Sequence, residues 1–174
     1  MSGGLSTVPK RAGEAGARRR RGLRRVLFSL VALVPLLGLL GFFGPRLGDV
    51  SARAGDLELA VTYPRINRPG LAAKLSAKVR RPGLAQAPVT LAVESSYLDA
   101  LAEVTVDPEP TTSTADAYRT IWTFEPPPDG DTLVVSVQGR MHPSGRIGRP
   151  AGTVAVLEDG TVAVAVRFRT WVVP

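Results

Sequence analysis

Hydrophobic and polar side chains alternate with a period of two along most of the chain after residue 56, and this pattern is typical of half-buried β-strands. The predicted strands are residues 57–63, 71–81, 88–95, 118–125, 132–139 and the two arms of a hairpin over 153–173. Within that hairpin, Asp159-Gly160 has the residue types of a two-residue turn. A short strand is also possible at 102–106, and SSYLDALAEV (95–104) is compatible with a helical turn capped by Ser96.

The strand parities predict a core. Tyr118, Trp122 and Phe124 share one face of their strand, and the second arm of the hairpin has an inner row of Val162, Val164, Val166 and Phe168. Short strands separated by Gly/Pro-rich turns are typical of a sandwich or barrel, and the polar face on nearly every strand favours two packed antiparallel sheets. We therefore expect an all-β, Ig-like antiparallel sandwich of about seven strands. Trp122 resembles the core tryptophan of immunoglobulin-like domains, although no cysteine pair accompanies it.

Residues 26–43 carry no charge and consist mostly of Val, Leu and Phe. As a helix they would extend about 27 Å, close to the ~30 Å thickness of a hydrocarbon core, so we expect a transmembrane helix. Basic residues concentrate on its N-terminal side, and the positive-inside rule then places the N-terminus in the cytoplasm. The arginines expected to set this topology and to meet lipid headgroups are Arg18, Arg19, Arg20, Arg21, Arg24 and Arg25.

A cleaved signal is the alternative reading of the same region. Arg24-Arg25 precedes the apolar block as in twin-arginine signals, and Ala52-Arg53-Ala54 has the small-x-small form of a cleavage site. The block is longer than a usual signal core, and the site lies well beyond its end. A retained anchor is therefore the favoured interpretation, and release near Ala54 stays the alternative.

Charge is divided unevenly along the chain. Residues 1–46 hold nine basic residues and one acid, whereas residues 47–174 hold thirteen basic and fourteen acidic residues. The sequence pI of about 10.7 is thus a property of the N-terminal region. Since the predicted domain has no basic excess, we expect no nucleic-acid partner.

The sequence offers little for catalysis or metal binding. It contains no cysteine and a single histidine, His142, which is followed by a proline in a predicted loop. Two groups of carboxylates, around 103–116 and at Asp129 and Asp131, do not have the spacing of an EF-hand calcium loop. We expect no enzymatic activity, no metal site and no cofactor.

One loop, 140–149, carries several basic residues and no acid. Trp171 lies on the outward parity of its strand, beside Arg167 and Arg169. Because guanidinium groups fit phosphate and carboxylate, these positions are candidates for binding an anionic envelope polymer, headgroups or an acidic protein. The candidate ligand-facing residues are Arg140, His142, Arg146, Arg149 and Trp171.

The segments YPRINRPG, PVTLAVESSYLDAL, DPEP, WTFEPPPDGDTL and GTVAVLEDG follow the basic head and apolar block. In this arrangement the chain resembles a group of uncharacterised actinobacterial single-pass membrane proteins with an extracytoplasmic Ig-like β domain. The resemblance implies a location for the domain and no activity.

The predicted organisation has four parts: a disordered basic cytoplasmic tail (1–25), a transmembrane helix (26–43), a linker (44–55) and an extracytoplasmic β-sandwich (56–174). The expected function is that of a membrane-anchored binding module of the cell envelope, with an envelope protein or an anionic wall polymer as partner. The alternatives are a structural accessory subunit of a larger membrane complex and a released secreted domain.

Overall fold

The computed structural model describes residues 27–29, 31–33, 35–36, 46–128, 130–143 and 148–174. The chain divides into two compact units, Met1–Gly44 and Pro45–Pro174. In the first unit the described residues are helical. None of the helices among the described residues combines the length and hydropathy that crossing a bilayer requires. The predicted tail with its six arginines, and the remaining positions of the predicted span, lie outside the described residues.

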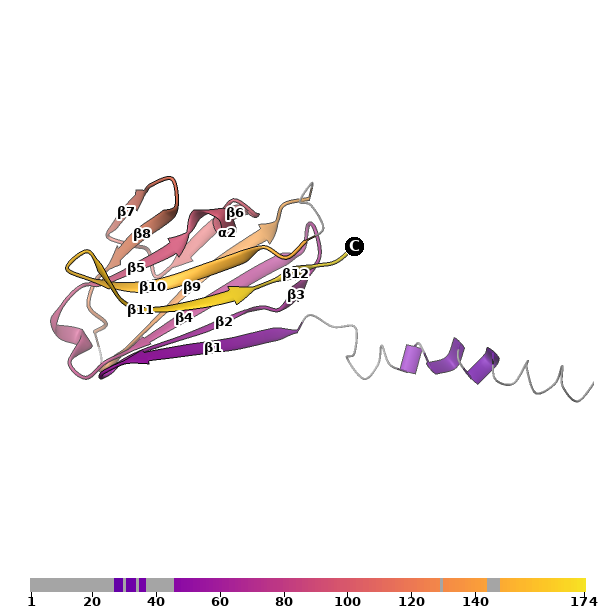
Figure 1. Ribbon diagram of the computed structural model, residues 1–174, viewed down its shortest axis with the longest axis horizontal. Helices are drawn as coiled ribbons and strands as arrows, with labels where there is room; N and C mark the ends of the chain where they lie inside the picture. Colours follow the sequence, from indigo (N-terminus) through magenta and orange to yellow (C-terminus); the bar gives the residue numbers. More distant parts are fainter. Residues whose placement is uncertain (1–26, 30, 34, 37–45, 129, 144–147) are drawn as a thin grey trace, which may run out of the picture. The chain divides into compact units, whose positions relative to one another are not determined.

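The second unit is built from two five-stranded antiparallel sheets (Figure 1). The first sheet has the strand order β1-β2-β4-β9-β6. Its strands are β1 Leu47–Ala54, β2 Leu57–Pro64, β4 Ala72–Arg80, β9 Thr132–Met141 and β6 Leu101–Asp107. The second sheet has the order β11-β10-β5-β8-β7. Its strands are β11 Thr161–Arg169, β10 Ala151–Glu158, β5 Val89–Glu94, β8 Arg119–Phe124 and β7 Thr112–Ala115.

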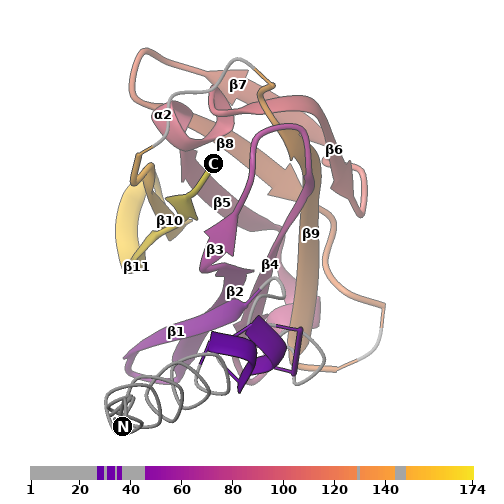
Figure 2. The same ribbon diagram turned by 90° about the vertical axis from the view of Figure 1, so that its right-hand side faces the viewer.

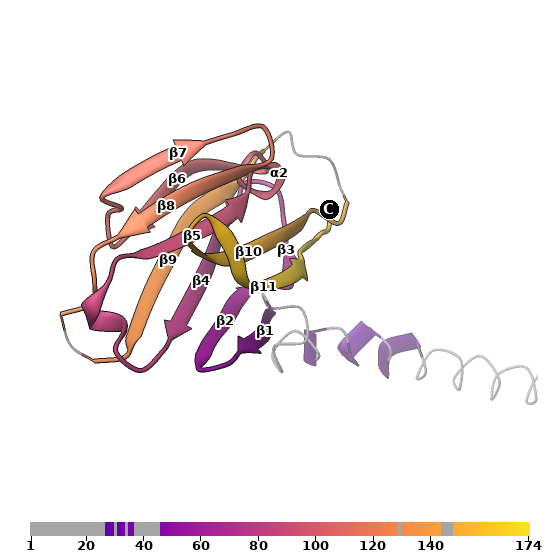
Figure 3. The same cartoon turned by 60° about the vertical axis from the view of Figure 1, so that its left-hand side comes forward.

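Three short elements complete the unit. The strands β3 Ile66–Asn67 and β12 Trp171–Val172 form a parallel two-stranded sheet at the end of the sandwich that holds the C-terminus (Figure 2). A 3-10 turn, η1 Leu84–Gln86, connects β4 to β5, and the helical turn α2 Ser95–Leu98 connects β5 to β6. The edge strands β6 and β7 lie along one side of the sandwich, and β1 and β11 along the other (Figure 3).

The core lies between the two sheets and is formed by the alternating inward side chains of both. Leu59, Leu75 and Val135 of the first sheet meet Leu91 and Phe124 of the second in one continuous buried cluster. Burial of these apolar side chains, at roughly 25 cal/mol per Å², is the main stabilising contribution to such a sandwich. The predicted all-β antiparallel architecture is therefore confirmed.

Several predictions about single elements were wrong. The predicted linker 44–55 contains β1, which pairs with β2 along its whole length from Leu47 to Ala54. The strand number exceeds seven, because β1, β3 and β7 were not foreseen and β12 was predicted as the end of the second hairpin arm. Ser96 does not cap α2: the N-cap is Glu94, and the Ser96 hydroxyl donates a hydrogen bond of 2.9 Å to its carboxylate.

The core prediction holds for most positions. Trp122 and Phe124 are buried, as are Val164, Val166 and Phe168. Tyr118 is instead 82% exposed because it precedes the first residue of β8, and Val162 is exposed beside the hairpin turn. That turn is formed by Asp159 and Gly160, both with positive φ, as predicted for a two-residue hairpin connection.

Candidate functional site

The last strand segment of the chain presents a basic and aromatic row to solvent. From Phe168 onward every second residue is buried, namely Phe168, Thr170 and Val172. The residues between and before them, Arg167, Arg169 and Trp171, are exposed. Because successive side chains of an extended chain point to opposite sides, these three lie on the same side of this segment, Arg167 and Arg169 in β11 and Trp171 in β12, which pairs with β3. The outward parity predicted for Trp171 is thus confirmed.

Arg149 joins this row from the segment just before β10. Thr170 donates a backbone hydrogen bond of 3.0 Å to the carbonyl of Pro150, which aligns the residues before β10 with those after β11. The Arg149 guanidinium carbon then lies 4.3 Å from the centroid of the Trp171 ring, within the range of a cation–π contact. We refer to Arg149, Arg167, Arg169 and Trp171 as the strip.

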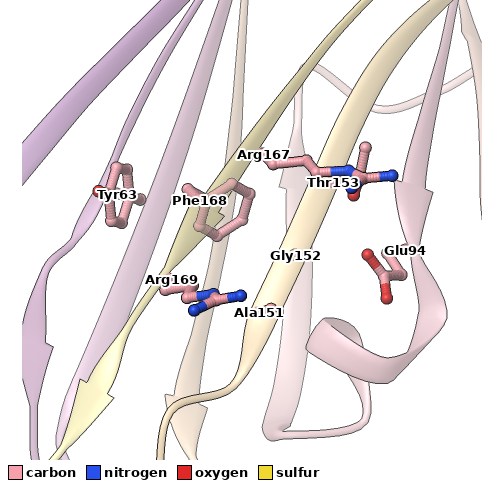
Figure 4. Close-up of a pocket in the computed structure, with 8 residues that line it drawn as sticks. All are labelled: Tyr63, Glu94, Ala151, Gly152, Thr153, Arg167, Phe168 and Arg169. Atoms are coloured by element: carbon pink, nitrogen blue, oxygen red, sulfur yellow. The ribbon is translucent and has the colours of Figure 1, made fainter.

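A shallow groove of about 470 Å³ runs beside the strip (Figure 4). Its lining residues are Tyr63, Glu94, Ala151, Gly152, Thr153, Arg167, Phe168 and Arg169. Cross-strand pairing places Ala151 opposite Arg169 and Thr153 opposite Arg167. Figure 4 shows the two arginine side chains reaching from β11 across β10, with Glu94 on the far side of the groove. Because Ala151 and Thr153 have small side chains, the guanidinium groups of Arg167 and Arg169 remain accessible.

The strip carries uncompensated positive charge. The ion pairs within the described residues are Arg53–Glu58, Arg81–Glu158, Arg119–Asp116 and Arg140–Glu103. None of them involves Arg149, Arg167 or Arg169. Of the carboxylates that the structure describes, Glu94 is the one that lines the groove, and it accepts the hydrogen bond from Ser96. A ligand with phosphate or carboxylate groups would meet several guanidinium donors and one repelling group.

Backbone hydrogen bonds connect the strip to the point where the chain enters the domain. The amide of Trp171 donates to the carbonyl of Arg65 over 2.8 Å, and the amide of Arg65 donates to the carbonyl of Arg46 over 2.7 Å. Arg46 directly precedes β1. Trp171 therefore lies two strand spacings, about 10 Å, from the first described residue of the domain.

Two of the predicted ligand-facing residues lie elsewhere. Arg140 is in β9 of the first sheet, where its Nε lies 3.6 Å from the Glu103 carboxylate. The backbone amide of His142 donates to the carbonyl of Ala100 over 3.0 Å. The His142 side chain lines a separate cavity of about 320 Å³ near α2, together with Ser96, Asp99, Ala100, Met141, Pro150 and Val172. Arg140 and His142 are therefore not part of the strip, although Pro150 and Val172, which line the His142 cavity, are the neighbours of Arg149 and Trp171 in the chain. Arg146 lies outside the described residues, and a ligand-facing role for these three residues stays a prediction.

Arg167 and Arg169 belong to the strip but were not among the predicted ligand-facing residues, although their parity in the sequence already matched that of Trp171. The carboxylates considered for calcium take structural roles. Asp116 accepts two backbone N–H groups before β8, and Asp131 accepts the amide of Gly83 over 2.8 Å. Across the described ranges, no three His, Cys, Asp or Glu side chains gather as metal ligands would.

No protein-family model matches the chain, and no curated protein matches it significantly. Among solved structures, it is similar to the CARDB domain of the PF1109 protein from Pyrococcus furiosus, which was crystallised in complex with di-metal ions. The match has 14% sequence identity and a TM-score of 0.36, and it covers 74% of this chain and 89% of the other. This degree of similarity supports no inference about ligands of the present chain.

Proposed function

We propose that this protein is a membrane-anchored, extracytoplasmic binding module with an Ig-like sandwich and no enzymatic activity. Residues 1–25 lie in the cytoplasm, residues 26–43 span the membrane, and the sandwich takes a phosphate- or carboxylate-bearing component of the cell envelope at the strip. The observation that carries the proposal is the strip itself: three arginines without carboxylate partners among the described residues, aligned with an exposed tryptophan.

The geometry of the strip suits a ligand with repeated negative charges. Arg167 and Arg169 are two residues apart on one strand, which separates their Cα atoms by about 7 Å. Each guanidinium presents parallel N–H donors that match one phosphate or carboxylate group. Trp171 adds a flat apolar surface at the end of the row, a residue type enriched at the centres of interfaces.

The position of β1 supports a retained anchor over release at Ala54. All eight residues of β1 pair with β2, and Val50 and Ala52 pack against the core. Cleavage after Ala54 would remove this strand and leave β2, still paired with β4, as an edge strand with its other side unpaired. Retention keeps the sheet whole and keeps the sandwich attached to the apolar segment.

The absence of cysteine permits a direct test of topology. Ser113→Cys places a single thiol on the exposed strand β7, and Ser6→Cys places one in the N-terminal tail. In intact cells, a membrane-impermeant maleimide should label the first variant, and it should label the second only after permeabilisation. The reverse order of labelling would contradict the proposal.

Binding is tested on right-side-out membrane vesicles that display the full-length protein, with poly(glycerol phosphate) as the probe. A triple variant, Arg149→Gln, Arg167→Gln and Arg169→Gln, should bind the polymer roughly tenfold more weakly, from about 0.5 kcal/mol per exposed contact. The matched control is Lys74→Gln, Lys78→Gln and Arg80→Gln, which removes the same charge from exposed positions of β4. Equal losses in both variants would contradict a specific role for the strip.

A further inference from the structure

We infer that the strip rests on the anionic phospholipid surface of the membrane that anchors the chain, so that the sandwich lies against the headgroups. This inference rests on the proposed function and names its partner. Three features support it: the path of the chain, the residue types of the strip and the short side chains beside it.

The path of the chain fixes how far the strip can be from the bilayer. Trp171, Arg65 and Arg46 are joined by successive backbone hydrogen bonds, which puts Trp171 about 10 Å from Arg46. Residues 44 and 45 alone separate Arg46 from the apolar segment 26–43. A fully extended chain covers at most about 3.5 Å per residue, so Trp171 lies within about 20 Å of the end of that segment.

The residue types of the strip are those that bind the boundary between headgroups and acyl chains. Tryptophan is enriched at this boundary because its ring is apolar and its N–H donates to polar groups. Arginine extends its guanidinium to headgroup phosphates while its methylene groups remain in a less polar layer. Arg65 and Arg68, exposed beside β3, add positive charge at the same end of the sandwich.

The side chains on the outer face next to Arg167 and Arg169 are short. They are Ala151 and Thr153 of β10, which pair with these arginines, and Ala165 of β11. Such short side chains leave the guanidinium groups of Arg167 and Arg169 open to a surface that approaches this face. If the apolar segment spans a membrane, the chain holds the strip close to that surface, which raises the effective concentration of headgroups at the strip.

The fluorescence of Trp171 itself can report whether the strip contacts the membrane. The chain has two tryptophans, of which Trp122 is 5% exposed and Trp171 is 49% exposed. The full-length protein is reconstituted into vesicles of phosphatidylcholine alone or of phosphatidylcholine and phosphatidylglycerol at about 3:1. The fluorescence of Trp171 is taken as the difference between the unchanged protein and Trp171→Phe, and acrylamide serves as quencher because it is neutral.

We expect acrylamide to quench Trp171 at least twofold less in the phosphatidylglycerol vesicles, with a shift of its emission to shorter wavelength. Phosphatidylcholine brominated near the headgroup should quench Trp171 in the anionic vesicles. The triple Gln variant of the strip should lose both effects, and the triple Gln variant of β4 should keep them. High salt should weaken them, because it shortens the range of charge attraction.

Each other outcome overturns a defined part of the argument. Equal quenching in the two kinds of vesicle overturns the lipid inference. If poly(glycerol phosphate) protects Trp171 and anionic vesicles do not, the lipid inference fails and the proposed binding module stands. If neither protects it, both fail. Labelling of Ser113→Cys only after permeabilisation would overturn the extracytoplasmic location whatever the vesicles show.

Discussion

Gly152 and Phe168 are direct cross-strand partners in β10 and β11, and the Phe168 ring occupies the space above the glycine. A Cβ at position 152 would lie 2.6 Å from Cζ of Phe168 and 3.0 Å from Cγ of Tyr97. The same relationship recurs between Gly48 and Tyr63, where a Cβ would lie 2.8 Å from the ring carbon Cζ. The two glycines thus make room for an aromatic group.

That group consists of Tyr63, Phe168 and Tyr97. The Phe168 ring centroid lies 4.9 Å from that of Tyr63 and 4.8 Å from that of Tyr97, the latter in an edge-to-face arrangement. Such pairs add about 0.5–1.5 kcal/mol beyond the burial of their area. The group connects β2, β11 and α2, and two of its rings, Tyr63 and Phe168, line the groove beside the strip.

Gly152→Ala should therefore destabilise the domain although alanine is the better strand residue. Overpacking costs typically about 1–3 kcal/mol, which exceeds the ~0.5–1 kcal/mol gained by replacing a strand glycine. We expect a net loss of about 1–2 kcal/mol in chemical denaturation of the full-length protein. Thr153→Ala, at an outward position of the same strand, should change the midpoint little. If the denaturation midpoint of Gly152→Ala equals that of the unchanged protein, the aromatic rings move to accommodate the added methyl group without loss of stability.

Tyr97 should make the domain sensitive to alkaline pH. Its side chain is fully buried, and burial raises the pKa of its hydroxyl above the ordinary value of 10.0, against a smaller lowering by the 3.4 Å hydrogen bond with Thr170. Because the pKa is higher in the folded than in the unfolded chain, stability is complete below pH 10 and declines as pH rises above it. Tyr97→Phe should flatten this decline in denaturation experiments between pH 9 and 11. An unchanged slope would exclude Tyr97 as its source.

Asp116 should hold β7 against β8 in a pH-dependent way. Its carboxylate accepts the backbone amides of Tyr118 and Arg119, each over 2.8 Å, and these bonds lower its pKa below the ordinary 3.8. A pKa lowered by folding gives a contribution that is present above pH 4 and is lost as pH falls through the folded value. Asp116→Ala should lower the protection factors of the β7 amides, measured against their intrinsic exchange rates, at pH 6, and it should remove the loss of protection that the unchanged protein shows in acid. Exchange in β4 serves as the control.

The period-two pattern was sufficient for the strands that face the core. β2, β4, β8, β9 and β11 have buried residues at alternate positions that the sequence displays directly, whereas β5 and β10 are also buried on their other side through Ala92, Ala155 and Leu157. β7 (TSTA) could not be found in this way, because all four of its residues are exposed. β1 has only Val50 and Ala52 as apolar residues packed against the core, and it is held in place mainly by backbone hydrogen bonds to β2. Its sequence therefore shows little hydrophobic periodicity.

The candidate site was predictable in part for a similar reason. Parity along one strand placed Trp171, Arg167 and Arg169 on the same face, since alternation is a local property. Arg149 joins them through a cross-strand alignment that depends on the loop before β10, and no local pattern encodes it. Arg140 is close to Arg149 in sequence but belongs to β9 of the other sheet, whereas His142 follows β9 and lines a cavity with Pro150 and Val172. Proximity in the sequence therefore did not decide which basic residues belong to the strip.

The stack of Arg149 on Trp171 should be visible without any ligand. The Arg149 guanidinium carbon lies 4.3 Å from the ring centroid and shields one face of the indole. Arg149→Ala should therefore increase the quenching of Trp171 fluorescence by acrylamide in phosphatidylcholine vesicles. In Arg149→Lys the shielding should be kept only in part, because an ammonium group is not planar. The stability change should stay within about 1 kcal/mol, the usual contribution of an exposed cation–π contact. Arg167→Ala is the matched control, because its side chain lines the groove and makes no ring contact among those described. Equal quenching in all four proteins would mean that the stack is not populated, and Trp171 alone would then remain as the aromatic element of the strip.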